Sequence, residues 1–454
     1  MKRIRRIAGE IRKWEDVVVI GHYDADGIAA TAIMVEALSR AGKNVKYVNL
    51  KQLYSDDLEK IQNMGEHFIF VDFGAGQLPL LLRSFEKPFV VVDHHRKAAE
   101  YPLMLHAEDL GAVGHRDVSG AGLSYLLAKE LADVKDMAKI AVVGAVGDMQ
   151  MRKGRLVGIN REILIDAVST GDIFAYKDLS LYGRVSRPLP YMLMFSTDPI
   201  LPGLTANESG CFRFLEMAGI DVKDGERWRT YVDLSQEERR KLFTALSYYL
   251  MRRGWNTERV SRLIGEVYDI TSEDLHSPLR EVREFATLLN AAGRHGCPEV
   301  GVEVCRGDRG SKYEEALSLW NKHKRMLREG IAWVLERGVE ETEYAYYFHA
   351  RDRIPAPIVG IVAGMVYGSG LVPTDRPIFA FAYEDGWVKV SARATHDLVA
   401  RGVDLSVVMR EASSRVGGEG GGHKPAAGAR IPKGSEEDFL REVDRILATL
   451  LASV

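Results

Sequence analysis

The stretch Val17-Val18-Val19-Ile20-Gly21-His22-Tyr23-Asp24-Ala25-Asp26-Gly27 decides the fold that this sequence predicts. It opens with four consecutive apolar residues, and such a run suits a strand that is covered on both faces. Gly21 and Gly27 permit a tight turn from that strand into a helix. The histidine and both aspartates fall in this turn. The stretch therefore predicts a parallel strand whose carboxyl end carries acidic and imidazole side chains.

Further apolar runs in the first third of the chain repeat this pattern, with helix-forming segments between them. The expected strands are Val17–Ile20, Val45–Leu50, Phe68–Val71 and Phe89–Val92, and the expected helices are Ile28–Ala41 and Ser55–Met64. Strands that alternate with helices are typical of a parallel α/β domain. We therefore predict the α/β fold class, with a parallel sheet at the start of the chain.

Acids and histidines follow the third and fourth of these strands as well. Asp72 ends the run Phe68–Val71, and Asp93-His94-His95 ends the run Phe89–Val92. In an open parallel sheet, ligands bind beyond the carboxyl ends of the strands. Three strands therefore bring acids and imidazoles to the same edge of the sheet.

The chemistry of such an edge is restricted. Carboxylates held together raise one another's pKa unless cations neutralise them. Carboxylates with imidazoles suit Mn²⁺, Mg²⁺ or Zn²⁺, and the imidazoles favour Mn²⁺ over Mg²⁺. Two such ions about 3.5–4 Å apart can activate water and clamp the oxygens of an in-line displacement at phosphorus. A single strand-end acid is more often a helix cap, but its repetition at three strand ends favours a two-metal site.

The rest of the chain is predicted to be helical in the middle and mixed at the end. Expected helices are Ser235–Arg253, Lys312–Arg337, Ile358–Tyr367 and Ser435–Leu451, with a strand at Tyr344–His349 and a hairpin of Ile378–Tyr383 and Trp387–Ser391. Helix Lys312–Arg337 carries an apolar stripe, which fits either buried core or a partner-docking surface. The run Gly417–Gly422 is expected to be a turn. Consecutive glycines let backbone N–H groups approach a phosphate, although a flexible loop would show the same composition.

Composition excludes several classes of protein. The chain is 46% hydrophobic and 28% charged, and it contains no run of roughly 18 apolar residues that could span a membrane. Its three cysteines form no C-x-x-C pair, which argues against a disulfide framework or a cysteine zinc site. The basic N-terminus lacks the apolar segment of a signal peptide and is expected to form an amphipathic helix. We therefore expect a cytoplasmic protein, and the net charge of −3 leaves nucleic-acid binding open.

These motifs resemble those of the DHH phosphoesterase superfamily. His22-Tyr23-Asp24-Ala25-Asp26-Gly27, Val71-Asp72-Phe73-Gly74 and Asp93-His94-His95 match its first three motifs. Its fourth motif is an aspartate on the helix after Ser119-Gly120-Ala121-Gly122, and Asp148 fits it, although Asp117, Asp133 and Asp136 lie nearby. The resemblance implies one metal on His22, Asp24 and Asp72, and a second on Asp26, Asp72, His94 and Asp148. It also implies that Asp93 orients a ligand and that His95 faces the scissile phosphate.

The end of the chain resembles the DHH-associated substrate-binding domain. Its nucleotide-binding residues would be Ser391, Arg393, Gly420, Gly421, Gly422, His423 and Lys424. The expected domains are a catalytic domain at 1–175, a helical region at 176–338 that could dock a partner, and the substrate-binding domain at 339–454.

Motifs in the middle of the chain resemble archaeal RecJ-like proteins, with the GINS-associated nuclease as the nearest group. They are Tyr182-Gly183-Arg184, Arg187-Pro188-Leu189, Glu284–Asn290 and Gly293-Arg294. The resemblance implies an exonuclease on single-stranded DNA that binds the GINS complex, with RNA open as a further substrate. Arg184 and Arg187 are candidate phosphate contacts or parts of a solvated loop, and Tyr182, Tyr383 and Trp387 are candidates for base stacking.

Two other functions stay open at this level. A phosphodiesterase for short oligonucleotides or nucleotides would need the same metals, and a replisome scaffold would need none. Small-substrate relatives tend to be compact, and a scaffold predicts eroded motifs, so the length and the intact acids favour the exonuclease. Cleavage polarity, the choice between DNA and RNA, and the oligomeric state are not determined by the sequence.

Overall fold

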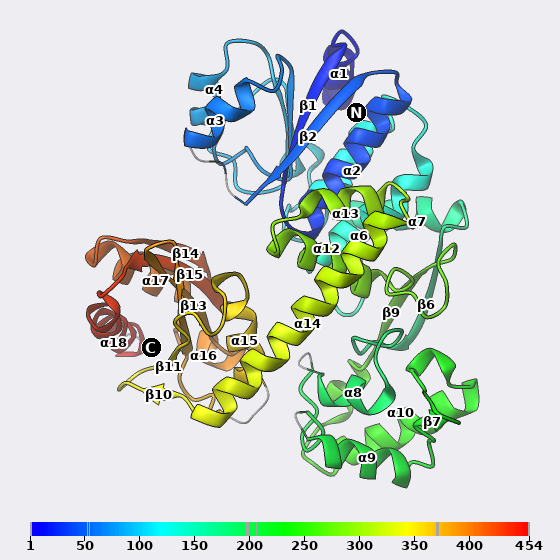
Figure 1. The fold of residues 1–454 in the computed structure, drawn as a ribbon, viewed down its shortest axis with the longest axis vertical. Helices are drawn as coiled ribbons and strands as arrows, with labels where there is room; N and C mark the ends of the chain where they lie inside the picture. Colours follow the sequence, from blue (N-terminus) through cyan, green and yellow to red (C-terminus); the bar gives the residue numbers. More distant parts are fainter. Residues whose placement is uncertain are drawn as a thin grey trace. The chain divides into compact units, whose positions relative to one another are not determined.

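The computed structural model describes residues 2–51, 53, 55–196, 199–205, 207–368 and 372–452 (Figure 1). The chain divides into two compact units. The first comprises Met1–Met192 and Phe212–Trp320, and the second comprises Leu193–Cys211 and Asn321–Val454. Among the described residues, no helix combines the length and the apolar character that a membrane crossing requires.

A parallel sheet of five strands forms the centre of the first unit, in the order β2-β1-β3-β4-β5. Its strands are β1 (Asp16–His22), β2 (Asn44–Leu50), β3 (Phe68–Val71), β4 (Val90–Asp93) and β5 (Met104–His106). The surrounding helices are α1 (Lys2–Ile11), α2 (Ala25–Arg40), α3 (Ser55–Gln62), α4 (Leu78–Ser84), η1 (Ala107–Leu110), α5 (Gly120–Ala128), η2 (Lys135–Met137), α6 (Ala138–Gly147) and α7 (Gly158–Ser169). The predicted α/β class and its four strands are confirmed, and the short strand β5 is an addition.

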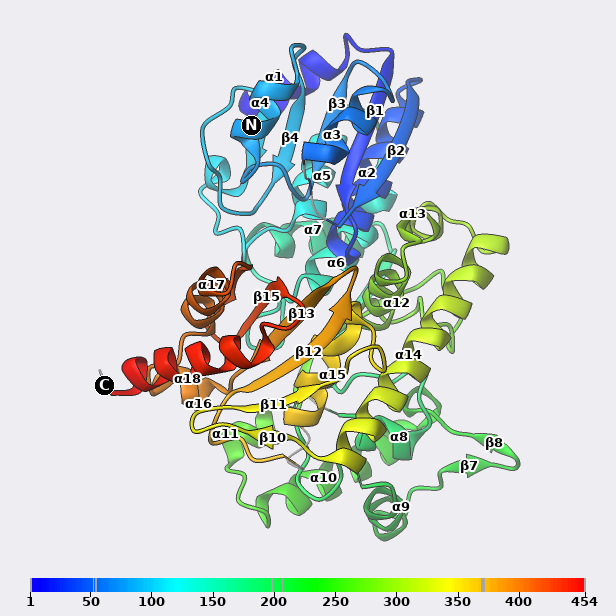
Figure 2. The same cartoon turned by 60° about the vertical axis from the view of Figure 1, so that its left-hand side comes forward.

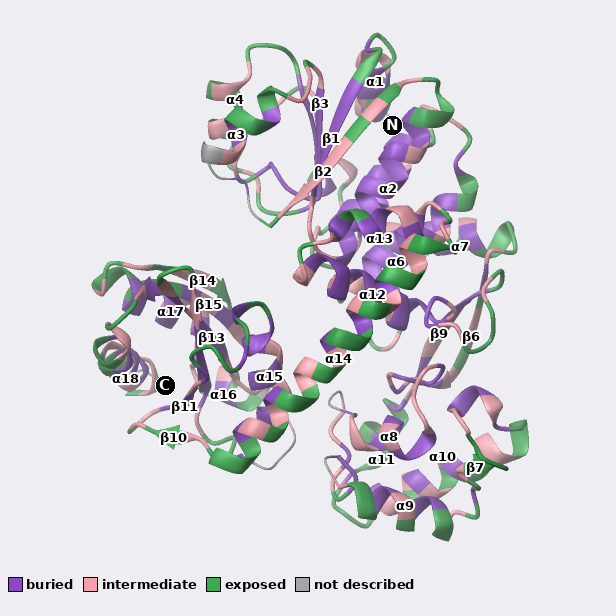
Figure 3. Ribbon diagram, viewed as in Figure 1, coloured by how far each residue is buried: buried purple, intermediate pink, exposed green. Residues whose placement is uncertain are grey.

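Both faces of this sheet are covered, which explains its continuous apolar strands. Alternate strand residues, such as Val19 and Ile69, pack on one face with α1, α2, α5 and α6. The intervening residues, such as Ile20 and Phe70, pack on the other face with α3 and α4. Figure 3 shows the buried centre of this unit along β1, β3 and α2. Strand order reverses next to β1, with β2 on one side and β3 on the other, so the carboxyl ends of β1 and β3 flank a topological switch point.

The remaining elements up to residue 337 are mostly helical. They are β6 (Ile173–Leu179), α8 (Leu189–Met194), α9 (Glu208–Met217), β7 (Lys223–Asp224), β8 (Arg227–Trp228), η3 (Tyr231–Asp233), α10 (Gln236–Met251), α11 (Thr257–Ser261), β9 (Ile264–Ile270), α12 (Val282–Arg294), α13 (Pro298–Cys305) and α14 (Ser311–Arg337). The predicted helices Ser235–Arg253 and Lys312–Arg337 are confirmed as α10 and α14. Strands β6 and β9 pair antiparallel.

Helix α14 contributes its apolar stripe to two cores. Leu317 and Trp320 pack with the core of the first unit. Leu327, Ile331 and Val334 pack with the core of the second unit. Trp320 and Val334 are buried, while Leu317, Leu327 and Ile331 are partly buried against these cores, so the stripe packs as core.

The second unit is built on a six-stranded sheet in the order β10-β11-β12-β13-β15-β14. Its elements are β10 (Glu340–Glu341), β11 (Tyr346–His349), α15 (Ala356–Gly368), β12 (Ile378–Glu384), β13 (Trp387–Arg393), α16 (His396–Ala400), α17 (Leu405–Arg415), β14 (Glu419–His423), β15 (Ala426–Pro432) and α18 (Glu436–Ala452). The predicted hairpin is confirmed as β12–β13, drawn in orange in Figure 2. Its two turn residues, Asp385 and Gly386, both have positive φ (48° and 81°), as a type I′ turn requires.

The predicted glycine turn is wrong in its conformation. Residues Glu419–His423 form the edge strand β14, paired with β15, and the chain turns at Lys424-Pro425 instead. Gly420 is needed for packing, because a Cβ there would lie 2.5 Å from the Met409 carbonyl oxygen of α17. Glycine thus permits close contact between strand and helix in this run.

Helix α12 makes a close contact with the turn that follows β1. Asn290 Oδ1 accepts a hydrogen bond from the Ala25 backbone N–H at 3.0 Å. One turn later, a Cβ on Gly293 would lie 1.8 Å from the Tyr23 carbonyl oxygen. The distant residues 290 and 293 therefore hold the loop that carries Asp24.

We predict that Gly293→Ala destabilises the protein by about 1–3 kcal/mol, because the methyl group forces α12 away from Tyr23. Gly9→Ala in α1 is the matched control, since nothing lies within 4 Å of its Cβ position. A helical Gly→Ala change at such a site is expected to add about 0.5–1 kcal/mol. Urea unfolding of both variants measures the difference, and equal stabilities would contradict the contact.

Candidate metal centre

The turn after β1 supplies three of the predicted ligands. His22 is the last residue of β1, and Asp24 is the N-cap of α2, where its Oδ1 accepts from the Gly27 N–H at 3.0 Å. The other carboxylate oxygen of Asp24 lies 3.0 Å from His22 Nδ1. Asp26 lies in the first turn of α2 and accepts from the backbone N–H groups of Gly120 and Ala121, at 2.7 and 3.0 Å. Asp24 is thus a helix cap with one oxygen left for a ligand.

Asp72 is central to the site and has an uncommon backbone conformation. It follows β3, is only 1% exposed, and has a φ of 62°, in the left-handed region that non-glycine residues rarely adopt. A Cβ on Gly120 would lie 2.3 Å from Asp72 Oδ1, so glycine at the start of α5 makes room for this carboxylate. Strained backbone of this kind is concentrated at functional sites.

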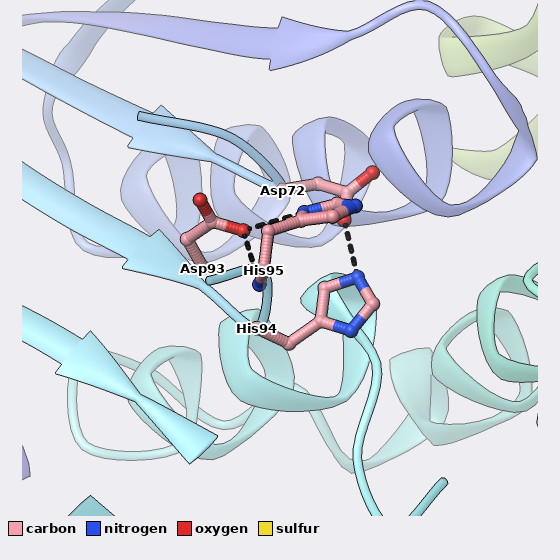
Figure 4. Close-up of side chains that lie close together, drawn as sticks. All are labelled: Asp72, Asp93, His94 and His95. Atoms are coloured by element: carbon pink, nitrogen blue, oxygen red, sulfur yellow. Dashed lines mark hydrogen bonds and ion pairs between the residues drawn. The ribbon is translucent and has the colours of Figure 1, made fainter. Parts of the chain in front are cut away.

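The end of β4 supplies Asp93, His94 and His95, which Figure 4 shows beside Asp72. Asp93 is buried and uses both of its oxygens on protein groups. Oδ2 accepts from the Ala75 N–H at 2.9 Å, while Oδ1 faces His95 Nδ1 at 2.8 Å. Asp93 therefore orients its neighbours, and His95 remains half exposed.

The structure gathers the predicted ligands into overlapping groups whose donor atoms lie within 4.8 Å of one another. The groups are His22, Asp24 and Asp72; Asp26, His94 and Asp148; and Asp72, Asp93, His94 and His95. Asp72 lies between the first two, because its carboxylate is 3.7 Å from His22 Nδ1 and 3.2 Å from His94 Nε2.

This arrangement fits divalent cations. His22 Nδ1, Asp72 Oδ1 and His94 Nε2 are buried and form no hydrogen bond within the described part of the chain. Ligands about 2.0–2.2 Å from a metal ion stand about 3 Å or more apart, as these atoms do. Nitrogen and carboxylate oxygen together suit Mn²⁺ or Zn²⁺ and accommodate Mg²⁺.

The pKa shifts of the cluster also indicate a site for cations. Burial disfavours a charged His22, but the carboxylates of Asp24 and Asp72 outweigh it and raise its pKa to about 11. Burial also opposes charge on His94, and the carboxylates of Asp72, Asp26 and Asp148 raise its pKa. Burial raises the pKa of Asp26, and the nearby Asp72 and Asp148 add to this shift. Protons thus supply the positive charge that bound cations would supply in their place.

Asp148 belongs to the cluster. It is the C-cap of α6, which follows α5, and α5 begins at Gly120 with Ser119 as its N-cap. Two of the competing aspartates are used elsewhere: Asp117 pairs with Arg116 at 2.8 Å and Asp136 with Arg40 at 2.7 Å. Asp133 is in none of the three groups.

Several supporting residues were not predicted from the sequence. His106 on β5 is buried, and its Nε2 lies 2.6 Å from the His95 carbonyl oxygen. Gln150 and Asn160 are buried next to Asp148, and Asn290 caps the turn after β1. Two sequence signals existed: Gln150 follows Asp148 by two residues, and Asn290 ends the motif Glu284–Asn290.

Arg184 is not available as a phosphate contact in this structure. It is 1% exposed, its guanidinium donates to Asp178 Oδ2 at 2.5 Å, and it stacks over the Tyr231 ring at 4.7 Å. Arg187 is half-buried and lies over the Tyr182 ring at 4.7 Å. These side chains stabilise the region between β6 and α8, so their predicted role is not supported by their placement.

In the second unit, the predicted substrate-binding residues share one face of the sheet. Ser391 and Gly421 are both register partners of Gly428, and Arg393 and His423 are both partners of Ala426. Side chains of directly paired residues point to the same side of a sheet. Lys389, two residues before Ser391, faces the same way, and so does the acidic Glu419, two residues before Gly421.

Part of this face is open. Nothing lies within 4 Å of the Cβ position of Gly421, whereas its neighbour Gly420 packs against α17 on the opposite face. Lys424 lies at the turn beyond β14, where its Nζ is 3.7 Å from Asp404. Gly422 has a φ of 139°, which favours glycine. Of the candidate stacking residues, Trp387 lies under Arg430 and Tyr383 lies under Lys433, at 4.7 and 4.0 Å from the ring centres.

Comparisons with known proteins agree with this organisation. The DHH family N-terminal domain matches residues 16–146, the DHH-CID domain matches 181–264, and the DHHA1 domain matches 342–449. An uncharacterized protein of Methanocaldococcus jannaschii is 27% identical over 472 residues, which cover 99% of this chain and 99% of that protein. The single-stranded-DNA-specific exonuclease RecJ of Bacillus subtilis is 24% identical over 161 residues, which cover 32% of this chain and 20% of RecJ.

Solved structures share the fold at low identity. RecJ from Thermus thermophilus in complex with Mn²⁺ has a TM-score of 0.60 and 20% identity, covering 99% of this chain and 55% of that one. CDC45 from Entamoeba histolytica has a TM-score of 0.66 and 12% identity, covering 98% of this chain and 97% of that one. The three domain matches lie in sequence along the chain and include the strand-end acids. The chain therefore carries a DHH domain, a DHH-CID domain and a DHHA1 domain, in this order along the sequence.

Proposed function

We propose that this protein is a metal-dependent exonuclease that hydrolyses phosphodiester bonds in single-stranded nucleic acid, with DNA as its main substrate. The proposal depends on one observation, the cluster of five carboxylates and three imidazoles beside the carboxyl edge of the parallel sheet. Its residues are His22, Asp24, Asp26, Asp72, Asp93, His94, His95 and Asp148. A protein that had lost catalysis would have no reason to keep so costly a group of buried charges.

Asp72 would be a ligand of both cations. His22 and Asp24 would complete one ligand set, and Asp26, His94 and Asp148 would complete the other. We expect Mn²⁺, which is present in one of the RecJ structures with this fold, while another contains Mg²⁺. When bound, such ions supply a water-derived nucleophile at neutral pH and neutralise charge on the phosphate oxygens.

His95 would act on the scissile phosphate. The hydrogen bond to Asp93 raises the pKa of His95, which favours the imidazolium with its Nδ1 proton held by Asp93 Oδ1. Its side chain is 54% exposed, so the Nε2–H can donate to a phosphate oxygen or to the leaving oxygen. Asp93 thereby fixes the orientation of the His95 ring, which would act as the general acid.

The open sheet face of the second unit supports a polynucleotide substrate. Arg393, His423 and Lys389 share that face with Gly421, so basic side chains border a position that has no side chain and open space above it. Arginine and backbone N–H groups are the usual phosphate contacts.

The resemblance of the middle region to archaeal RecJ-like proteins supports GINS as a partner. Co-purification with GINS at low salt tests that claim.

Cleavage of end-labelled substrates tests the activity. Single-stranded DNA, single-stranded RNA, a matching duplex and a dinucleotide would each be incubated with Mn²⁺ or with EDTA. Ladders from one end of the single strands, absent in EDTA, are expected and give the polarity. Cleavage of the dinucleotide alone would instead indicate a small-substrate phosphodiesterase, and no cleavage with bound Mn²⁺ would indicate a scaffold.

We predict that Asp72→Asn lowers the cleavage rate by more than about 100-fold, because both proposed metal sites lose the carboxylate between them. Asp133→Asn is the matched control, since this aspartate is outside the three metal-binding groups. The measurement is initial rate in Mn²⁺, with circular dichroism to verify folding. A folded Asp72→Asn protein with a control-like rate would refute the site.

We also predict that Gly421→Val raises KM for oligonucleotides by about 10-fold or more, because the side chain fills the open face where a phosphate would approach the backbone. Thermal stability and Mn²⁺ binding should be unchanged, since nothing lies within 4 Å of this Cβ position. Gly420→Val is the contrasting variant and should unfold more easily, because its side chain collides with α17. An unchanged KM in Gly421→Val would mean that this face does not bind substrate.

A further inference from the structure

A chain of buried amides leads from the start of α5 to Asp148. Asn160 and Gln150 are 1% and 0% exposed, and both lie outside the sets of predicted ligands. Asn160 Oδ1 faces the Ser119 N–H at 3.3 Å, and Asn160 Nδ2 donates to Gln150 Oε1 at 2.6 Å. Gln150 Nε2 then donates to Asp148 Oδ2 at 2.7 Å.

The direction of this chain is determined by its first group. A backbone N–H can only donate, so the Ser119 N–H requires the oxygen of Asn160. The amide nitrogen of Asn160 must then face Gln150, whose oxygen accepts from it. This leaves the NH₂ group of Gln150 facing Asp148, so the carboxylate receives a donor and not an acceptor.

The same NH₂ group also reaches the surroundings of His94. Gln150 Nε2 donates to the Gly114 carbonyl oxygen at 2.8 Å, and His94 Nδ1 lies 2.7 Å from that same oxygen. Because a carbonyl oxygen only accepts, His94 carries its proton on Nδ1. Its Nε2 therefore points to Asp72, Asp26 and Asp148, at 3.2, 3.7 and 3.8 Å.

Asp26 and Asp148, two of the acids near His94, are thus oriented by groups at the N-terminal end of α5. Asp26 accepts from the N–H groups of Gly120 and Ala121, which follow Ser119 directly. Asp148 is held through Asn160 and Gln150 from the Ser119 N–H. The backbone at the start of α5 therefore orients Asp26 directly and orients Asp148 through the two amide side chains.

We propose that Gln150, oriented by Asn160, is the positioning residue that presents Asp148 and His94 as ligands for the second of the two cations. This inference rests on the proposed function, because it assumes that the cluster holds metal ions. Contacts of this kind, from groups that touch the ligands but not the ion, typically change metal affinity by about 10–100-fold when they are removed.

The test is Gln150→Glu, which keeps the size of the side chain but replaces the donor with an oxygen facing Asp148. Mn²⁺ binding would be titrated by electron paramagnetic resonance and calorimetry. We expect two bound ions in the wild type, one of them weakened about 10–100-fold in the variant, and cleavage that excess Mn²⁺ restores. Gln62→Glu, an exposed amide on α3, is the matched control and should bind Mn²⁺ like the wild type.

Asn160→Asp is a second test of the role of Gln150, because Asn160 is not among the residues of the metal-binding groups. Its second oxygen would force the Gln150 amide to turn its own oxygen toward Asp148, so the same Mn²⁺ site should weaken. A purely structural role predicts lower melting temperatures with unchanged Mn²⁺ affinity, and that result in both variants would overturn the inference while the proposed function stands. A wild-type protein that binds no Mn²⁺ would overturn both.

Discussion

Repulsion between carboxylates at the carboxyl edge of the parallel sheet is the constraint on which the rest of the first unit depends. Asp26, Asp72 and Asp93 are each 2% exposed or less, and Asp24 and Asp148 lie beside them. Charges so close together and so far from water are tolerated only if the protein supplies hydrogen bonds and opposite charge. The backbone N–H groups of α5, the imidazoles of His22 and His94, and the proposed cations meet that demand.

This constraint explains why glycine occurs where the helices meet the cluster. A Cβ at Gly120 would lie 2.3 Å from Asp72 Oδ1, and one at Gly144 would lie 2.5 Å from Asp26 Oδ1. Helices α5 and α6 can therefore approach the carboxylates closely, and the N–H groups of Gly120 and Ala121 in α5 donate to Asp26. Close approach in turn strengthens the electrostatic interaction of every charged group inside the site.

The two units contribute different chemistry to the proposed function. The first gathers carboxylates and imidazoles, which suit cations, and the second presents arginine, lysine and histidine on the face of Gly421, which suits phosphate. A polynucleotide substrate needs both kinds of group.

The sequence by itself determined the fold class, the central strands and the strand-end acids, because each depends on local pattern. Four apolar residues followed by His22, Asp24 and Asp26 specify a buried strand and its edge without information from elsewhere in the chain. Only the tertiary structure decided the roles of Gln150, Asn160 and Asn290, since their partners are set by packing. Tertiary contacts also bury Arg184 against Asp178. They make the glycine run a strand, because Gly420 packs against α17, a contact that the local pattern of the sequence does not reveal.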